Sequence, residues 1–299
     1  MKRVMIFTLV NVAILIMLSI TCEVIFALLG VQAQEVFGEY SNVAVFALVF
    51  GFGGAFISLL LSKPMAKWST GAKTITGDEG EAERWLVDTI ASLARQANVK
   101  MPEVAIYKGA ANAFATGAFK NSALIAVSTD IMRQMTREEL RAVLGHEMSH
   151  VVNGDMVTMC LAQGVLNTFV LFVSRVAAWT VTRAMENRED GRSSRRGGGM
   201  LYYVIVRVFE LLLGLLASIV TCWYSRKREF AADAGSARLL GSPYPMIAAL
   251  RRLGNLQPGV LPESIKAFGI ASAKPKESLF ATHPALERRI SALETLAVH

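Results

Sequence analysis

Four long apolar stretches limit what this chain can fold into more than any other feature. They cover residues 4–22, 43–61, 157–174 and 202–223, and only the last contains charged side chains, Arg207 and Glu210. Each stretch approaches the roughly 20 residues that a helix needs to cross about 30 Å of hydrocarbon. Hydrophobic residues make up 53% of the 299 positions, a share that few soluble proteins reach. The sequence therefore predicts an integral membrane protein.

Positive charges beside the first two stretches predict the orientation of the chain. They precede the first stretch and follow the second, at Lys2, Arg3, Lys63, Lys67 and Lys73, whereas residues 31–42 contain no lysine or arginine. By the positive-inside rule, the N-terminus and the region after Lys63 face the cytoplasm. The first stretch exceeds the roughly 7–15 apolar residues usual for a signal peptide. We therefore interpret it as an uncleaved anchor, with cleavage after VQA at 31–33 as the alternative.

The path of the third and fourth stretches stays open in the sequence. Their connection, residues 183–199, contains five arginines, which argues against its transfer across the membrane. Arg175, Arg207 and Glu210 would lie at membrane depth, which is tolerable only near an interface or with a partner. A spanning hairpin and an interfacial hairpin both satisfy these constraints, and we favour the spanning pair.

The apolar stretches divide the chain into four parts. Residues 1–62 form an anchor of two transmembrane helices, residues 63–155 and 225–299 form the two parts of a cytoplasmic domain, and residues 156–224 form a hydrophobic helical hairpin. The cysteines, Cys22, Cys160 and Cys222, lie in or at the ends of apolar stretches and show no metal-ligand spacing or disulfide pattern. The net charge of +7 comes largely from residues beside the stretches, so we expect no nucleic-acid partner.

Residues 63–155 contain both helical and strand patterns. Residues 81–99 repeat apolar side chains at helical spacing. Residues 102–109 and 123–130 are short β-branched and apolar runs bounded by turn residues, and 111–119 between them suit a short or edge strand. Thr136 and Glu139 have the spacing of a capping box, which predicts a helix that begins there and ends near Asn153-Gly154.

The motif GHEMSH, at residues 145–150, lies on that helix. His146 and His150 are four residues apart, so both imidazoles can turn a nitrogen toward one point about 2.0–2.1 Å away, the zinc–nitrogen distance. Glu147 lies about 100° further round the helix, where its carboxylate reaches a water on the metal, as a general base requires. With only four histidines in the chain, this spacing predicts a metal site.

A catalytic zinc usually needs a third protein ligand. A histidine six residues after His150 would indicate a metzincin, but Met156 stands there, which excludes that class. Asp155 follows the helix end and is better suited to cap or orient the turn. Glu229 and Asp233 are again four apart on a predicted helix. One of these carboxylates can bind the metal while the other accepts a hydrogen bond from a ligand imidazole.

The pattern HExxH followed by ExxxD resembles the gluzincin arrangement of thermolysin-like peptidases. The segments NAFATG (112–117), GHEMSHVVNGDMVTM (145–159), SRKREFAADAGSA (225–237) and THPALERRI (282–290) are similar, in order and spacing, to the bacterial heat-shock membrane peptidases of the M48 metallopeptidase family. The similarity covers nearly the whole chain. It implies an α-helical membrane protein with an α+β gluzincin-like zinc metallopeptidase domain, built from a small edge-stranded sheet and active-site helices.

The resemblance also implies a role for each matching residue. One zinc ion per chain is held by His146, His150 and Glu229, with Glu147 as the base and Asp233 bracing a ligand histidine. His283 and Arg289 are expected to stabilise the oxyanion, because a donor beside the metal lowers the energy of a tetrahedral intermediate. The strand at Asn112, Ala113, Phe114 and Ala115 is expected to pair with the substrate backbone.

The implied activity is hydrolysis of peptide bonds in misfolded or damaged membrane proteins during stress, with cleavage of the chain itself as a further expectation. The expected partners are membrane-protein substrates and the lipid bilayer, and the expected location is the bacterial cytoplasmic (inner) membrane, with several spans and a cytoplasmic catalytic domain. Two alternatives remain. A prenyl-protein-type peptidase shares the zinc chemistry, although four apolar stretches are few to enclose a lipid tail. A non-catalytic zinc-stabilised scaffold or chaperone would not need Glu147.

Overall fold

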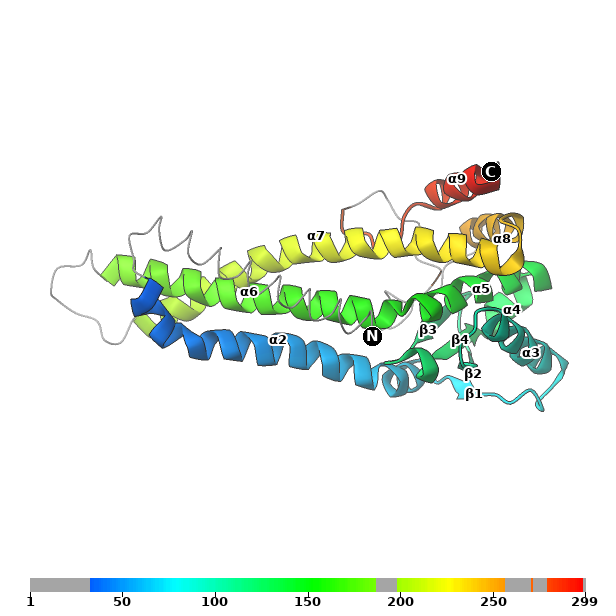
Figure 1. Ribbon diagram of the computed structural model, residues 1–299, viewed down its shortest axis with the longest axis horizontal. Helices are drawn as coiled ribbons and strands as arrows, with labels where there is room; N and C mark the ends of the chain where they lie inside the picture. Colours follow the sequence, from blue (N-terminus) through cyan, green and yellow to red (C-terminus); the bar gives the residue numbers. More distant parts are fainter. Residues whose placement is uncertain (1–32, 187–197, 256–269, 271–278, 298–299) are drawn as a thin grey trace. The chain divides into compact units, whose positions relative to one another are not determined.

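The computed structural model describes residues 33–186, 198–255, 270 and 279–297, and helices account for most of them (Figure 1). The predicted apolar stretch at residues 4–22 lies outside the described residues. The chain divides into two compact units. The helical unit comprises Met1–Ile57 and Cys160–Val220, and the sheet unit comprises Ser58–Met159 and Thr221–His299.

The described part of the helical unit consists of segments of long helices. They are α2 (Ala33–Thr70), α6 (Asp155–Glu186) and α7 (Gly198–Leu240), which contain the other three apolar stretches. Among the described residues, α6 and α7 are long and apolar enough to cross a membrane. Only 17% of the most apolar window of α6 and 6% of that of α7 is buried within the chain. Their exposed apolar side chains are typical of helices that a bilayer covers.

The small residues Gly51 and Ala55, one helical turn apart in α2, predict that another helix packs closely there. The structure confirms this prediction, and the helix is α6. A Cβ atom on Gly51 would lie 2.2 Å from Thr168 Oγ1, so no larger residue fits at this position. Cys160 Sγ donates a hydrogen bond to the Ala55 carbonyl at 3.1 Å.

The charged residues on the apolar stretches of α6 and α7 are paired. Glu210 accepts a hydrogen bond from Arg175 at 3.2 Å and another from Arg207 at 2.8 Å. Since Arg175 lies on α6 and Glu210 on α7, their ion pair links the two helices. The prediction that these charges need partners is confirmed.

The sheet unit contains a four-stranded sheet in the order β1-β2-β4-β3. The central strands β2 and β4 are parallel, while β1 and β3 pair antiparallel at the two edges. The three strands predicted from the sequence are confirmed, and β3 is an edge strand as expected. The two-residue strand β1 is too short to be predicted from its pattern. The strands are β1 (Lys73–Thr74), β2 (Glu103–Tyr107), β3 (Ala113–Thr116) and β4 (Leu124–Ser128).

Helices pack on this sheet and on one another to form the core of the sheet unit (Figure 1). Helix α5 contacts β3, α3 and α8, and α8 contacts α9. Leu86, Ile90 and Leu93, which the helical spacing places on one face of α3, are fully buried. The helices are α3 (Glu81–Gln96), the 3₁₀ helix η1 (Lys120–Ser122), α4 (Thr129–Gln134), α5 (Arg137–Asn153), α8 (Tyr244–Asn255) and α9 (Leu286–Ala297).

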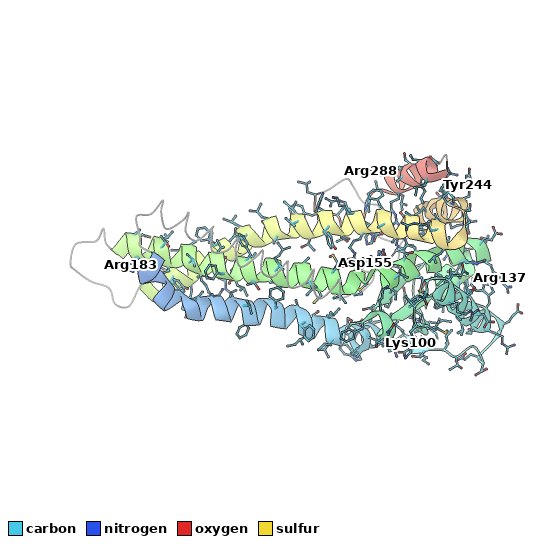
Figure 2. The ribbon with its side chains drawn as sticks, viewed as in Figure 1. Lys100, Arg137, Asp155, Arg183, Tyr244 and Arg288 are labelled. Atoms are coloured by element: carbon cyan, nitrogen blue, oxygen red, sulfur yellow. The ribbon has the colours of Figure 1, made fainter. Side chains whose placement is uncertain are left out.

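Helix α5, which carries the GHEMSH motif, begins and ends where the sequence predicts. Thr136 Oγ1 accepts a hydrogen bond from the Glu139 N–H at 3.2 Å, and Glu139 Oε2 accepts one from the Thr136 N–H at 2.9 Å. Gly154 ends the helix in the left-handed conformation, with φ of 66°. Helix α6 begins at the next residue, Asp155, which lies at the junction of the two helices (Figure 2). This turn brings Asp155 back toward His150.

Candidate metal centre

Helix α5 places three residues of the motif together in the interior of the sheet unit. His146, Glu147 and His150 are all buried. Because the two histidines are one turn apart, their rings meet edge to face, and their Nε2 atoms lie 3.1 Å apart. Two lone pairs facing each other at this distance repel unless a proton or a cation lies between them. The pair therefore has the geometry of a cation site.

Helix α7 supplies a third candidate ligand. The buried Glu229 carboxylate has Oε1 3.4 Å from His150 Nε2 and Oε2 3.6 Å from His146 Nε2. The potential ligand atoms of His146, His150 and Glu229 all lie within 4.8 Å of one another. Glu229 reaches this point because α7 continues as a single helix from the apolar stretch into the sheet unit.

The donor set fits a zinc ion. Zinc binds imidazole nitrogen and carboxylate oxygen at about 2.0–2.2 Å in a tetrahedron, which puts neighbouring donor atoms roughly 3.3 Å apart. The observed separations of 3.1, 3.4 and 3.6 Å lie around this value. Magnesium and calcium prefer oxygen ligands, so two imidazoles disfavour them.

One support fixes His146. Asp233 Oδ1 lies 2.9 Å from His146 Nδ1. Arg289 of α9 donates to both oxygens of Asp233, from Nε to Oδ2 at 2.8 Å and from Nη2 to Oδ1 at 2.7 Å. The Arg289 side chain is 1% exposed. This Asp233–Arg289 support orients the imidazole so that Nε2 faces the other ligands.

A second support fixes His150. Asp155 Oδ2 lies 2.6 Å from His150 Nδ1, and Asp155 Oδ1 lies 3.2 Å from Arg228 Nε. Arg228 directly precedes Glu229 and its side chain is 12% exposed. The sequence pattern alone assigns no role to Arg228. Its position directly before the candidate ligand Glu229, in the basic run SRKR, could have indicated that it lies near the metal centre. We call this pair the Asp155–Arg228 support.

The two histidines differ in their electrostatic surroundings. Burial lowers the pKa of His146 below its ordinary value of 6.5, against the opposite effect of Asp233. Burial also acts to lower the pKa of His150, but the hydrogen bonds to Asp155 and Glu229 outweigh it and raise that pKa to about 10. Since metal ligation needs neutral imidazole, a bound metal would compete with a proton at His150 more than at His146.

Glu147 has the properties of a proton acceptor. Both oxygens of its carboxylate are buried and lack a hydrogen-bond partner among the described residues. Burial raises the pKa of Glu147 to about 8, and His150 and the Ala115 backbone offset only part of this effect. A buried carboxylate without partners is costly to keep, which points to a chemical role rather than a structural one.

His283 and Arg289 reach the centre from the C-terminal segment. His283 is buried, with Nδ1 3.0 Å from Glu229 Oε2, and Arg289 Nη1 lies 3.2 Å from the same oxygen. The other guanidinium nitrogens of Arg289 are bound to Asp233. His283 Nε2 has no hydrogen-bond partner among the described residues. Of these two residues, His283 is therefore the one that has a nitrogen atom, Nε2, available to a bound group.

The edge strand β3 lies against α5, and part of its outer edge is covered by the chain itself. The Ala113 carbonyl accepts a hydrogen bond from the Ile270 N–H at 3.0 Å. Backbone groups along a strand point alternately to either side, so Ala115 is the next residue that points outward. Of the predicted substrate-binding residues, Ala113, Phe114 and Ala115 lie in β3 and Asn112 directly precedes it.

Sequence comparisons identify relatives of the chain. Residues 81–297 match the pattern of Peptidase family M48. The chain is 54% identical over 297 residues to a Protease HtpX homolog of Verminephrobacter eiseniae (strain EF01-2), covering 98% of each protein. The chain belongs to peptidase family M48. It is also 50% identical over 296 residues to the Protease HtpX homolog of Bordetella pertussis (strain Tohama I), again covering 98% of each.

A solved structure has a similar fold. The crystal structure of S. mikatae Ste24p superimposes with a TM-score of 0.60 at 16% sequence identity, covering 96% of this chain and 66% of that chain. At this identity the likeness concerns the fold alone. It supports the α-helical membrane fold with an M48 peptidase domain that the sequence predicts.

In this M48 protein, the residues that the sequence singles out for the metal centre gather at one place. M48 is a metallopeptidase family, which agrees with the donor set of two imidazoles and a carboxylate. The roles assigned to these residues stay predictions, while their positions are observed. The gathered residues are His146, Glu147, His150, Asp155, Glu229, Asp233, His283 and Arg289.

Proposed function

We propose that this M48 protein is a zinc endopeptidase that cuts misfolded or damaged membrane proteins at the cytoplasmic face of the bacterial inner membrane. One observation carries the proposal: His146, His150 and Glu229 converge beside the buried carboxylate of Glu147, for which the described residues provide no side-chain hydrogen-bond partner. A purely structural zinc site closes its fourth position with a protein ligand and needs no such base.

The chemistry follows from the placement of these side chains. A zinc ion bound by the three ligands would polarise the substrate carbonyl and acidify a water molecule. Glu147 takes the proton from the attacking water and passes it to the nitrogen of the leaving amine. Burial brings the pKa of Glu147 closer to neutral pH than that of an ordinary carboxylate, which favours the return of the proton to the leaving amine. His283, through Nε2, is the residue that donates to the carbonyl oxygen as negative charge develops there.

The edge strand suits an extended substrate. A substrate strand added to β3 forms main-chain hydrogen bonds that do not depend on sequence, which a protease for damaged proteins requires. The outward backbone of Ala115 lies near Glu147. Pairing at Ala115 would bring the scissile bond to the base, whereas pairing at Ala113 requires release of the Ile270 N–H.

The candidate metal ligands lie close in sequence to the apolar stretches, which favours membrane proteins as the substrate class. The third apolar stretch begins two residues after Asp155, and the fourth ends at Trp223, six residues before Glu229. Six helical residues advance about 9 Å, so the ligand lies close to the end of an apolar helix. The lysines after the second stretch favour the cytoplasmic side. Cleavage of the chain itself is part of the proposal.

The decisive test is Glu147→Gln in the full chain. The substitution should keep bound zinc, measured by elemental analysis. It should reduce cleavage of an unfolded membrane-protein substrate by about 10²–10⁴-fold, because proton transfer is lost. Full activity in this variant would refute the role of Glu147. Zinc binding by the wild type without any cleavage would instead indicate a scaffold.

The proposed topology has its own test. We expect four spans, with α6 and α7 forming a spanning pair. A single cysteine placed in the arginine-rich connection between them should react with a membrane-impermeant reagent added from outside the cytoplasmic membrane. Reaction only after the membrane is opened would indicate an interfacial hairpin instead.

A further inference from the structure

One face of α7 carries side chains that lead from its apolar stretch to the metal centre. Cys222, Arg226, Glu229 and Asp233 are separated by four, three and four residues, so they lie on the same face of the helix. Each of them contacts the chain that precedes or forms α9. The contacts of Glu229 and Asp233 with His283 and Arg289 belong to the metal centre, whereas those of Cys222 and Arg226 do not.

Cys222 and Arg226 hold three consecutive carbonyls of a segment that we call the strap, residues 279–283. Arg226 Nη1 donates to the Leu279 carbonyl at 3.1 Å and to the Ala281 carbonyl at 2.6 Å. Cys222 Sγ lies 3.3 Å from the Phe280 carbonyl and donates to it. The first part of the strap is thus fixed to α7 through its backbone, and the side chains of Leu279 and Phe280 are left exposed.

The outward side chains of the strap are large and apolar. Leu279 is 62% exposed and Phe280 is 52% exposed. Beside them on α7, Trp223 is 50% exposed and is the last residue of the apolar stretch. Lys227 Nζ lies 4.1 Å from the centre of the Trp223 ring. Tryptophan with a neighbouring lysine is the combination found where a membrane helix meets the headgroups.

The other end of the strap enters the metal centre. His283 is three residues after Phe280, and its Nδ1 lies 3.0 Å from Glu229 Oε2. The same short segment therefore has exposed apolar side chains at one end and a buried imidazole beside a ligand at the other. Arg226 binds the carbonyls of Leu279 and Ala281, so His283 lies only two residues beyond this attachment.

We propose that the strap is a lipid-contact element that couples the bilayer to the position of His283. Leu279 and Phe280 enter the interfacial region of the bilayer beside Trp223, and this contact keeps the strap seated on α7. The occupant is lipid because the patch continues the apolar stretch of a membrane helix and has the exposed Lys227, whose charge suits phosphate headgroups. The coupling to catalysis rests on the proposed function, whereas the lipid contact does not.

The lipid contact is tested by photocrosslinking. The full chain, with the photoreactive amino acid p-benzoylphenylalanine at position 280 or at position 296, is reconstituted in vesicles of phosphatidylcholine and phosphatidylglycerol that contain radiolabelled phosphatidylcholine. Phe280 and Leu296 are 52% and 51% exposed, so they are matched for access. We expect labelled lipid attached at position 280 and none at position 296. Equal labelling at both positions, or adducts only with protein at position 280, would overturn the proposal.

The coupling is tested by activity in the same vesicles. Replacing both Leu279→Ser and Phe280→Ser should lower proteolysis about tenfold, because a misplaced catalytic group is costly, while zinc content and melting temperature stay unchanged. Leu296→Ser, the matched control, should retain wild-type activity. Unchanged activity in the double variant would overturn the coupling. A wild type that cleaves nothing would count against the proposed function, and the crosslinking result would still decide the lipid contact.

Discussion

His146 and His150 lie on the same helix and face the same centre, yet they are supported in different ways. His146 is held by Asp233, which a buried Arg289 binds through two hydrogen bonds. His150 is held by Asp155, which has a single contact with the more accessible Arg228. The first support joins α5, α7 and α9, whereas the second joins the end of α5, the start of α6 and α7.

The two supports differ in how far apart the histidine and its aspartate lie in the sequence, and the more distant pair is held by more hydrogen bonds to arginine. Asp155 is five residues from His150, and the turn at Gly154 already fixes its position, so a weak contact with Arg228 is enough. Asp233 is far from His146 in the sequence, and only packing of separate helices brings them together. A buried, bidentate arginine supplies the orientation that chain connectivity does not.

Removing the arginine of each support should reveal the largest difference between them, measured as the free energy of unfolding. Arg289→Met leaves Asp233 buried without its counter-charge, so we expect the free energy of unfolding to fall by about 3–5 kcal/mol. Arg228→Met should cost about 1 kcal/mol, because Asp155 keeps its hydrogen bond to His150. Denaturant unfolding of both variants in detergent, at equal zinc concentration, measures the difference. Equal losses would show that the two supports are equivalent.

Features set by local spacing could be predicted from the sequence. The capping box at Thr136, the helix end at Gly154 and the shared face of the two histidines depend on residues within one or two turns. The edge position of β3 also followed from its small residues between two stronger strand patterns. For the helix features, backbone periodicity alone decides which side chains are neighbours.

Features that depend on packing between elements could not be predicted in the same way. The resemblance assigns Arg289 to the oxyanion, and only the structure shows its two hydrogen bonds to Asp233. The contacts of Arg228 with Asp155 and of Ile270 with Ala113 have no local pattern at all. They arise from how helices and strands meet, which periodicity does not encode.

The aspartates of the two supports, Asp155 and Asp233, should affect zinc affinity alike and stability differently. Asp155→Asn and Asp233→Asn should each weaken zinc binding about 10–100-fold, because an amide orients the imidazole less firmly and removes a charge that favours its bond to the metal. Asp233→Asn should lower stability more than Asp155→Asn, because it leaves the buried Arg289 without its main partner. Competition with a chromophoric chelator measures affinity, and Asp88→Asn, on the exposed side of α3, is the control. Equal losses of stability in the two aspartate variants would remove the distinction.

The smallest expected effect is a difference in pH dependence between the two histidines in the chelator-treated protein. The pKa of His150 in the fold, about 10, lies above its ordinary 6.5, so its contribution to stability is complete below pH 6.5 and is lost as the pH rises toward 10. The pKa of His146 is lowered, so its contribution is present above pH 6.5 and is lost as the pH falls.

Stability of the metal-free wild type should therefore decline between pH 7 and pH 10, and Asp155→Asn should flatten that decline because it removes the main hydrogen bond that raises the pKa of His150. Groups remote from the metal centre titrate equally in both proteins, so only the difference between the two curves is informative. Zinc should abolish this difference, because the bound imidazole is neutral throughout. Parallel curves for the metal-free wild type and Asp155→Asn would mean that the Asp155–Arg228 support orients His150 without controlling its proton.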